Sequence, residues 1–215
     1  MSTVRAPFAP WDRRELPGLF GVEESARRIG NYRWTEMRLF EALGGWVATV
    51  PELDVKMVLG RHCYEHAWHA ELFTKRLPEL REMNVERQTK PANAEFEAFM
   101  AAVVEPEAPE LTIEKLVGVY RVLLPRKIAA YTFHMNATST ITDSPTIRSL
   151  NFALQDEYSD WREGEMLLQS LIDSTEKLER ALARQAALER LMYAAGGVAG
   201  PDSIGSQPAL QEATV

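Results

Sequence analysis

The stretch that decides the fold lies at residues 61–69 and reads Arg61-His62-Cys63-Tyr64-Glu65-His66-Ala67-Trp68-His69. It contains three of the four histidines of the chain. Side chains three, four and seven positions apart share one face of an α-helix, so His62, Glu65, His66 and His69 form a single stripe. Apolar residues continue this stripe on both sides, and an unpaired polar group in such a core costs about 1–3 kcal/mol. These four side chains must therefore have partners.

The composition indicates one globular domain without a nucleic-acid partner. The chain has 215 residues, 46% of them apolar, and a net charge of -7, whereas phosphate binding needs a basic surface. Its one cysteine, Cys63, leaves no intramolecular disulfide and is typical of a reducing compartment. We find no apolar signal-peptide segment near the start and no run of the ~18 apolar residues that a membrane span needs. We expect a cytoplasmic protein with no membrane partner.

Apolar periodicity predicts an all-α chain. We expect an N-terminal arm at residues 1–20, a helical domain at 21–195 and a disordered tail at 196–215. The expected helices span about 22–50, 54–83, 112–139, 143–172 and 174–195. Pro51 closes the first helix in a tight turn, which makes the first two helices antiparallel neighbours. The long segment 84–111 is a crossover to the third helix, and Pro125 is expected to kink that helix or split it in two.

Carboxylates interrupt the apolar stripes of the first and fourth helices as Glu65 interrupts the second. Glu36 and Glu157 each lie near the middle of their helix. The 29 residues from Glu36 to Glu65 match the path up one helix and back to the same height at ~1.5 Å per residue. We therefore expect the three carboxylates to converge with His62, His66 or His69. Carboxylate and imidazole ligands suit iron or manganese.

This layout resembles the ferritin-like superfamily, in the branch of rubrerythrins and small non-haem diiron oxidases and oxygenases. The resemblance covers about residues 22–172, where Glu36 and Glu65 match the first two glutamates and 143–160 is similar to the fourth helix. It implies a four-helix bundle with a long crossover between helices two and three, to which this chain adds a C-terminal helix. It also implies two iron ions, or a manganese–iron pair, with O2 and a small organic substrate as partners. The metal ligands expected on this basis are Glu36, His62, Glu65, His69, Glu157 and Asp160.

The sequence departs from the family pattern at three places. Trp68 and Asp160 stand where the family has histidine. The third helix has no central carboxylate, and the equivalent position holds Lys127, which would repel a metal unless it were neutral or turned away. We expect Lys127 and Tyr131 to be catalytic residues on the substrate side of the site.

Three functions remain open from the sequence. The leading expectation is a metal-dependent oxidoreductase, an oxidase or monooxygenase acting on a small organic molecule. The alternative is a metal-free degenerate scaffold or partner subunit, in which Lys127, Arg33 and the histidines pair with the buried carboxylates. A second alternative is a helical oxygenase of the haem-oxygenase-like type. The substrate, the reaction subtype and a homodimer through the fifth helix or the arm stay open.

Overall fold

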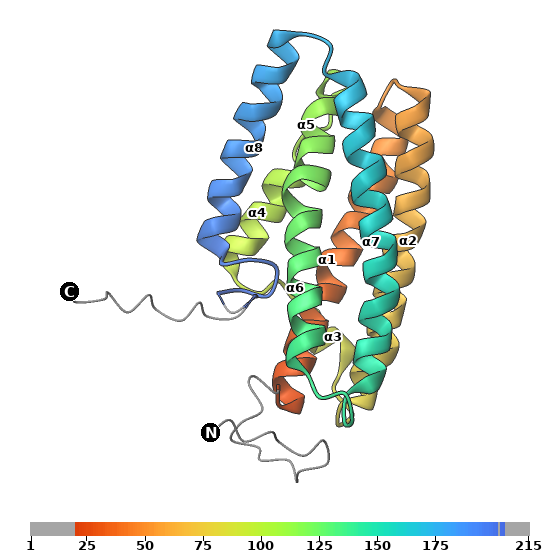
Figure 1. Ribbon diagram of the computed structural model, residues 1–215, viewed down its shortest axis with the longest axis vertical. Coiled ribbons are helices and arrows are strands. Elements are labelled where there is room, and N and C mark those ends of the chain that lie inside the picture. Colours follow the sequence, from red (N-terminus) through yellow and green to blue (C-terminus); the bar gives the residue numbers. More distant parts are fainter. Residues whose placement is uncertain (1–19, 202, 205–215) are drawn as a thin grey trace, which may run out of the picture.

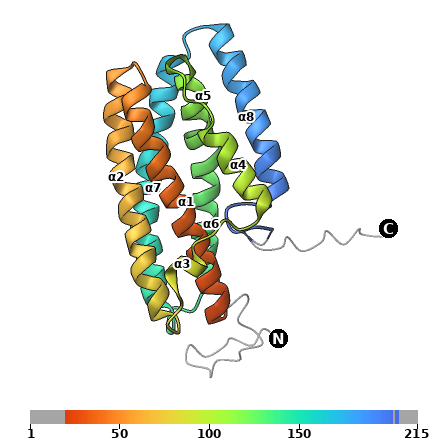
Figure 2. The same cartoon turned by 180° about the vertical axis from the view of Figure 1, so that it is seen from behind.

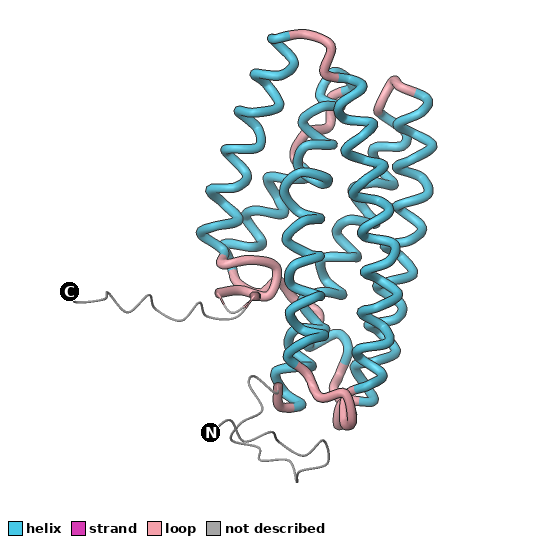
Figure 3. The backbone as a smooth tube through the Cα atoms, viewed as in Figure 1, coloured by secondary structure: helices cyan, strands magenta, loops and turns pink. Residues whose placement is uncertain are grey.

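The computed structural model describes residues 20–201 and 203–204, and every regular element in these residues is helical (Figure 3). The all-α prediction is thus confirmed. The predicted N-terminal arm lies outside the described residues except for Phe20, as does most of the predicted tail. None of the described helices has the length and apolar content to cross a membrane. The elements in chain order are α1 (Val22–Thr49), α2 (Leu53–Glu79), α3 (Val85–Gln88), α4 (Ala94–Val104), the 3-10 turn η2 (Pro109–Leu111), α5 (Thr112–Leu116), the π-helix η3 (Val117–Leu123), α6 (Leu124–Ala137), α7 (Ser144–Leu171) and α8 (Thr175–Ala195).

Four long helical runs lie side by side and enclose the core (Figure 1). They are α1, α2, α7 and the continuous run α5–η3–α6. Helix α1 packs along α2, α2 contacts α7, and α7 contacts α6. Helices α4 and α8 pack against each other on one side of this assembly, as Figure 2 shows from behind. The central turns of the four runs therefore face a common interior.

The third run contains a π-helical segment immediately before Pro125, which separates α5 from α6. Proline lacks an N–H, and its ring crowds the carbonyl four residues earlier. The backbone widens just before it, and the N–H of Leu124 bonds to the carbonyl of Val119, five residues back. Segments of this kind are frequent at functional sites. Tyr120 belongs to this segment, and its hydroxyl contacts His62 on α2.

Residues 196–201 and 203–204 continue the fold beyond α8, although the sequence predicted a disordered tail from residue 196. Gly196 ends the helix with φ 73°, the left-handed conformation that glycine adopts without strain at helix ends. Gly197 and Gly200 also have positive φ and turn the chain back on itself. As a result Val198 and Ala199 are buried, because the tight turn returns these small apolar side chains to the core.

Candidate functional site

Among the described residues, two groups of side chains that could hold a metal ion lie in the interior or at its edge. The four-residue group comprises Glu36, His66, His69 and Glu157, all fully buried, and the three-residue group comprises His62, Glu65 and Asp160. Within each group, one ligand atom of every member lies within 4.8 Å of those of the others. Buried Glu, His and Asp side chains that could hold a metal ion are thus a feature of the structure. All six predicted ligands belong to these groups, together with His66.

Lys127 on α6 occupies the centre of the four-residue group. Its Nζ donates to Oε2 of Glu36 at 2.9 Å and to Oε1 of Glu157 at 2.5 Å, and all three side chains are fully buried. The sequence left open whether this lysine turns away from the site, and the structure shows that it points into it. One ammonium therefore bridges the carboxylates of α1 and α7.

Glu36 receives further hydrogen bonds from its neighbours. Tyr131 OH donates to its Oε1 at 2.5 Å, and Nδ1 of His66 lies 2.8 Å from its Oε2. Tyr131 and Lys127 were expected to face a substrate. Both are fully buried and donate hydrogen bonds to the same carboxylate, and their catalytic role stays a prediction.

Lys127 supplies a positive charge between the two carboxylates of the four-residue group. Burial alone raises the pKa of Glu36 and of Glu157, but the Lys127 ammonium, together with His66 and His69, outweighs it and the pKa of each carboxyl is lowered. Burial alone lowers the pKa of Lys127, but Glu157 and Glu36 outweigh it and the net shift is upward. The group therefore contains ionised carboxylates with an ionised lysine between them.

His69 connects the four-residue group to the surface. Its Nε2 lies 3.0 Å from Oδ2 of Asp156, a carboxylate whose side chain is 33% exposed, and its Nδ1 faces Glu157 at 3.5 Å. Burial lowers the pKa of His69, but hydrogen bonds with Asp156, Glu157 and Glu36 outweigh it and raise the pKa well above its usual range. His69 thus supplies a second positive charge beside the buried carboxylates.

The three-residue group is built around His62. Nε2 of His62 lies 3.2 Å from Oδ1 of Asp160 and 3.0 Å from Oε2 of Glu163, and its Nδ1 lies 2.7 Å from the hydroxyl of Tyr120. Glu163 in turn pairs with Arg61 at the surface. Burial lowers the pKa of His62 to about 4, so the imidazole is neutral at neutral pH.

Two carboxyl oxygens of the three-residue group have no hydrogen-bond partner. They are Oδ2 of Asp160, whose side chain is only 2% exposed, and Oε2 of Glu65. Burial, together with the nearby Glu65 and Glu157, raises the pKa of Asp160 to about 9. Unpartnered buried acceptors cost free energy unless a cation or a proton satisfies them.

The two groups therefore differ in their fit to a metal ion. A neutral imidazole beside two carboxyl groups with free oxygens is a donor set for one divalent cation. In the four-residue group, Lys127 already binds one oxygen of Glu36 and one of Glu157, and its positive charge opposes a metal ion there, although Oε2 of Glu157, Nε2 of His66 and Nδ1 of His69 have no hydrogen-bond partner either. The residues present thus fit one metal in the three-residue group, whereas the two-metal centre expected from the family resemblance does not fit beside Lys127.

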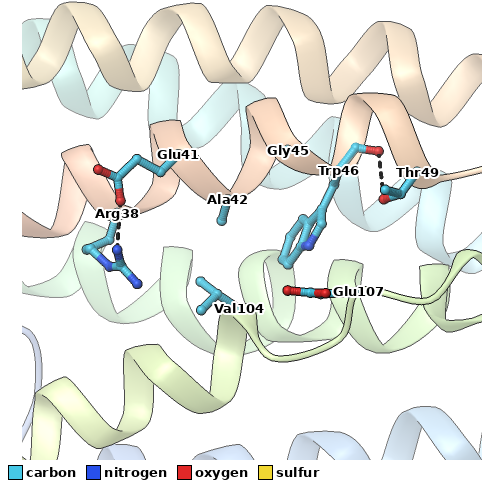
Figure 4. A pocket seen from close by; sticks show the side chains of 8 residues that line it. All are labelled: Arg38, Glu41, Ala42, Gly45, Trp46, Thr49, Val104 and Glu107. Atoms are coloured by element: carbon cyan, nitrogen blue, oxygen red, sulfur yellow. Dashed lines mark hydrogen bonds and ion pairs between the residues drawn. The ribbon is translucent and has the colours of Figure 1, made fainter.

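Two surface hollows lie near these elements. One, of about 380 Å³, faces α1; Trp46 lies opposite Glu107 there, and Arg38 pairs with Glu41 (Figure 4). The other, of about 390 Å³, runs along α7 beside Arg61 and has Glu163 in its wall. Only the second contains a residue that contacts either of the two groups.

Sequence reasoning missed Asp156 and Glu163, which connect the groups to the surface. A signal was present, because Glu163 follows Asp160 by three residues and shares its face of α7. Asp156 precedes Glu157 and gave no periodic signal. Comparisons with models of protein families, with curated proteins and with solved structures found no match to this chain.

Proposed function

We propose that this chain is a metal-binding helical protein of ferritin-like type that holds one divalent metal ion in the three-residue group. We further propose that it is an oxidoreductase that uses O2 and a small organic substrate. The observation that carries the proposal is the pair of unpartnered, buried oxygens on Glu65 and Asp160. The neighbouring four-residue group has Lys127 as its internal cation, whereas the three-residue group contains no ammonium or guanidinium.

His62, Glu65 and Asp160 would hold the ion. Imidazole and carboxylate ligands suit iron(II) or manganese(II), and such an ion, when bound, would supply the redox chemistry. Tyr120 orients the imidazole of His62 through Nδ1, which directs Nε2 toward Asp160. A partner of this kind on the second ring nitrogen is typical of metal-binding histidines.

The four-residue group would act as a fixed electrostatic neighbour of the metal. Lys127 keeps Glu36 and Glu157 ionised inside the core without a second metal. Asp156 and His69 form a hydrogen-bonded connection between this group and the surface. Protons consumed in a reduction of O2 could reach the interior along it.

Metal titration of the purified chain tests the proposal. Chelator-treated protein is loaded with iron(II) without oxygen, and in parallel with manganese(II), and bound metal and Tm are measured. Asp160→Asn is the informative variant: Asp160 is protonated in the metal-free fold, so the neutral amide replaces it with little cost in folding. Glu165→Gln, on the same helix but paired with Arg121 away from the group, is the matched control.

We expect one ion per chain and a higher Tm in the wild type and in Glu165→Gln, and neither in Asp160→Asn. Equal metal binding by Asp160→Asn would refute the assignment of the site.

The second candidate function is a metal-free scaffold or partner subunit. The Lys127 bridge favours it, because buried ion networks of this kind occur without any ligand. It predicts that chelator and added metal leave the Tm of the wild type unchanged, and that metal analysis finds no bound ion.

A further inference from the structure

The groove along α7 lies directly outside the three-residue group. Its walls include Arg61 from α2 and, from α7, Tyr158, Arg162, Glu163 and Met166. Glu163 belongs to both places: it pairs with Arg61 on the groove side and lies 3.0 Å from Nε2 of the buried His62 on the inner side. Whatever binds in the groove at Glu163 is therefore one side chain away from a proposed metal ligand.

The groove is positively charged although the whole chain has a net charge of -7. It contains two guanidinium groups, Arg61 and Arg162, against the single carboxylate of Glu163. Arg61 is engaged by Glu163, whereas Arg162 is exposed and makes no hydrogen bond or ion pair with any residue in the described part of the chain. The hollow near Trp46 differs, because its only arginine is paired with Glu41.

We propose that this groove binds a small organic carboxylate with an apolar body. Arg162 pairs with the carboxylate, since the planar guanidinium matches its two oxygens. Tyr158 and Met166 contact the apolar body, because they are the aromatic and thioether surfaces of the same groove. A small organic carboxylate would then be the substrate of the proposed oxidoreductase, and this part of the inference rests on the proposed function.

Binding in the groove also affects His62. A carboxylate that reaches Arg61 competes with Glu163 for the same guanidinium. Glu163 then loses the ion pair that holds it beside His62. The ligand and the metal are thereby coupled, and each changes the affinity of the chain for the other by the same factor.

Binding of benzoate, measured by NMR titration of the metal-free chain, tests the groove. Benzamide, which has the same shape without the charge, is the control ligand. Arg162→Gln removes the free guanidinium, and Arg190→Gln, an exposed arginine on α8 outside the groove, is the matched control. Glu163→Gln releases Arg61 from its ion pair.

We expect saturable binding of benzoate that weakens about tenfold in Arg162→Gln, is unchanged in Arg190→Gln and tightens in Glu163→Gln. Benzamide should bind more weakly than benzoate. Absence of saturable benzoate binding, equal binding of benzamide, or unchanged affinity in Arg162→Gln would each overturn the proposal.

Because benzoate binding is measured on the metal-free chain, its outcome is independent of the proposed metal site. If the wild type binds benzoate but no metal, the groove stands and the proposed function fails; if it binds metal but not benzoate, the proposed function stands and the groove fails.

Discussion

The Nζ atom of Lys127 on α6 lies 2.5 Å from Oε1 of Glu157 on α7, and both side chains are fully buried. The ferritin-like pattern proposed for this chain would have a glutamate at the position of Lys127. Because an ammonium stands there instead, we predict that the chain binds one metal ion fewer than that pattern implies.

Loss of the lysine should destabilise the fold strongly. Lys127→Met leaves Glu36 and Glu157 buried with no ammonium between them, and breaking a buried ion pair in this way costs about 3–5 kcal/mol. Denaturant unfolding at neutral pH measures the loss. Lys75→Met, at an exposed lysine paired with Glu71, should change stability by less than about 0.5 kcal/mol. A similar effect in both variants would show that the Lys127 network contributes little.

Gly164 on α7 is predicted to be indispensable for the position of Tyr120. A Cβ at Gly164 would lie 2.2 Å from the Tyr120 ring, so Gly164→Ala must displace that ring or the helix. Overpacking of this kind costs about 1–3 kcal/mol. At Gly45 a Cβ meets nothing within 4 Å, and Gly45→Ala should stabilise α1 by about 0.5–1 kcal/mol. Unfolding curves of the two variants should thus shift in opposite directions, and a stabilised Gly164→Ala would contradict the packing described.

Tyr120 should act on the metal through His62. Tyr120→Phe keeps the ring and removes the hydroxyl that lies 2.7 Å from Nδ1 of His62. Removal of such a partner weakens metal affinity by about 10–100-fold. Competition with a chelator of known affinity measures the change. Tyr158→Phe, on the surface of α7, serves as the control, and equal metal affinity in Tyr120→Phe and the wild type would show that the hydroxyl does not position His62.

Acid should destabilise the fold through His134, outside both groups. Burial, with Arg28 nearby, lowers the pKa of His134 to about 4 from 6.5. The unfolded chain takes up this proton as the pH falls below 6.5, while the folded chain resists until about 4. Burying a neutral His134 therefore costs no stability above pH 6.5. As the pH falls from 6.5 toward 4, it lowers the free energy of unfolding by on the order of 3 kcal/mol.

His134→Phe should remove this part of the pH dependence. The phenyl ring would face the rings of Phe20 and Tyr32, which already contact the ring of His134. The free energies of unfolding of the variant and the wild type are measured between pH 7 and pH 4. As the pH falls, the wild type should lose more stability than the variant. Parallel curves would contradict a neutral, buried His134.

The helices could be predicted because their signals are local. The turn at Pro51 is where the sequence placed it, and α8 begins after the capping residue Ser174 and ends at Gly196, close to the predicted range 174–195. The buried face of a helix is harder to predict: a spacing of four residues from Glu36 and of three from Leu43 favours Phe40 for the core of α1, but Phe40 is 45% exposed and Leu39 is buried. The two positions differ by about 100° around the helix, so periodicity alone separates them poorly when both are apolar.

The residues of the site could be found from the sequence, but their pairing could not. Charged residues inside apolar stripes marked Glu36, Glu65 and Glu157. Whether Lys127 faced them depended on the rotation of α6, which follows the π-helical segment before Pro125. That segment adds a residue to the turn and leaves no periodic signal. The contacts of Glu163 likewise depend on how α2 and α7 pack.

The number of metal ions bound per chain tests the central claim most directly. Wild-type protein is loaded anaerobically with excess iron(II), freed of unbound metal and analysed for iron and protein together. We predict one iron per chain in the wild type. The iron should be absent from Asp160→Asn and present in the fraction of Lys127→Met that remains folded. Two irons per chain in the wild type would contradict it, because the oxygens of Glu36 and Glu157 would then hold a metal in place of Lys127.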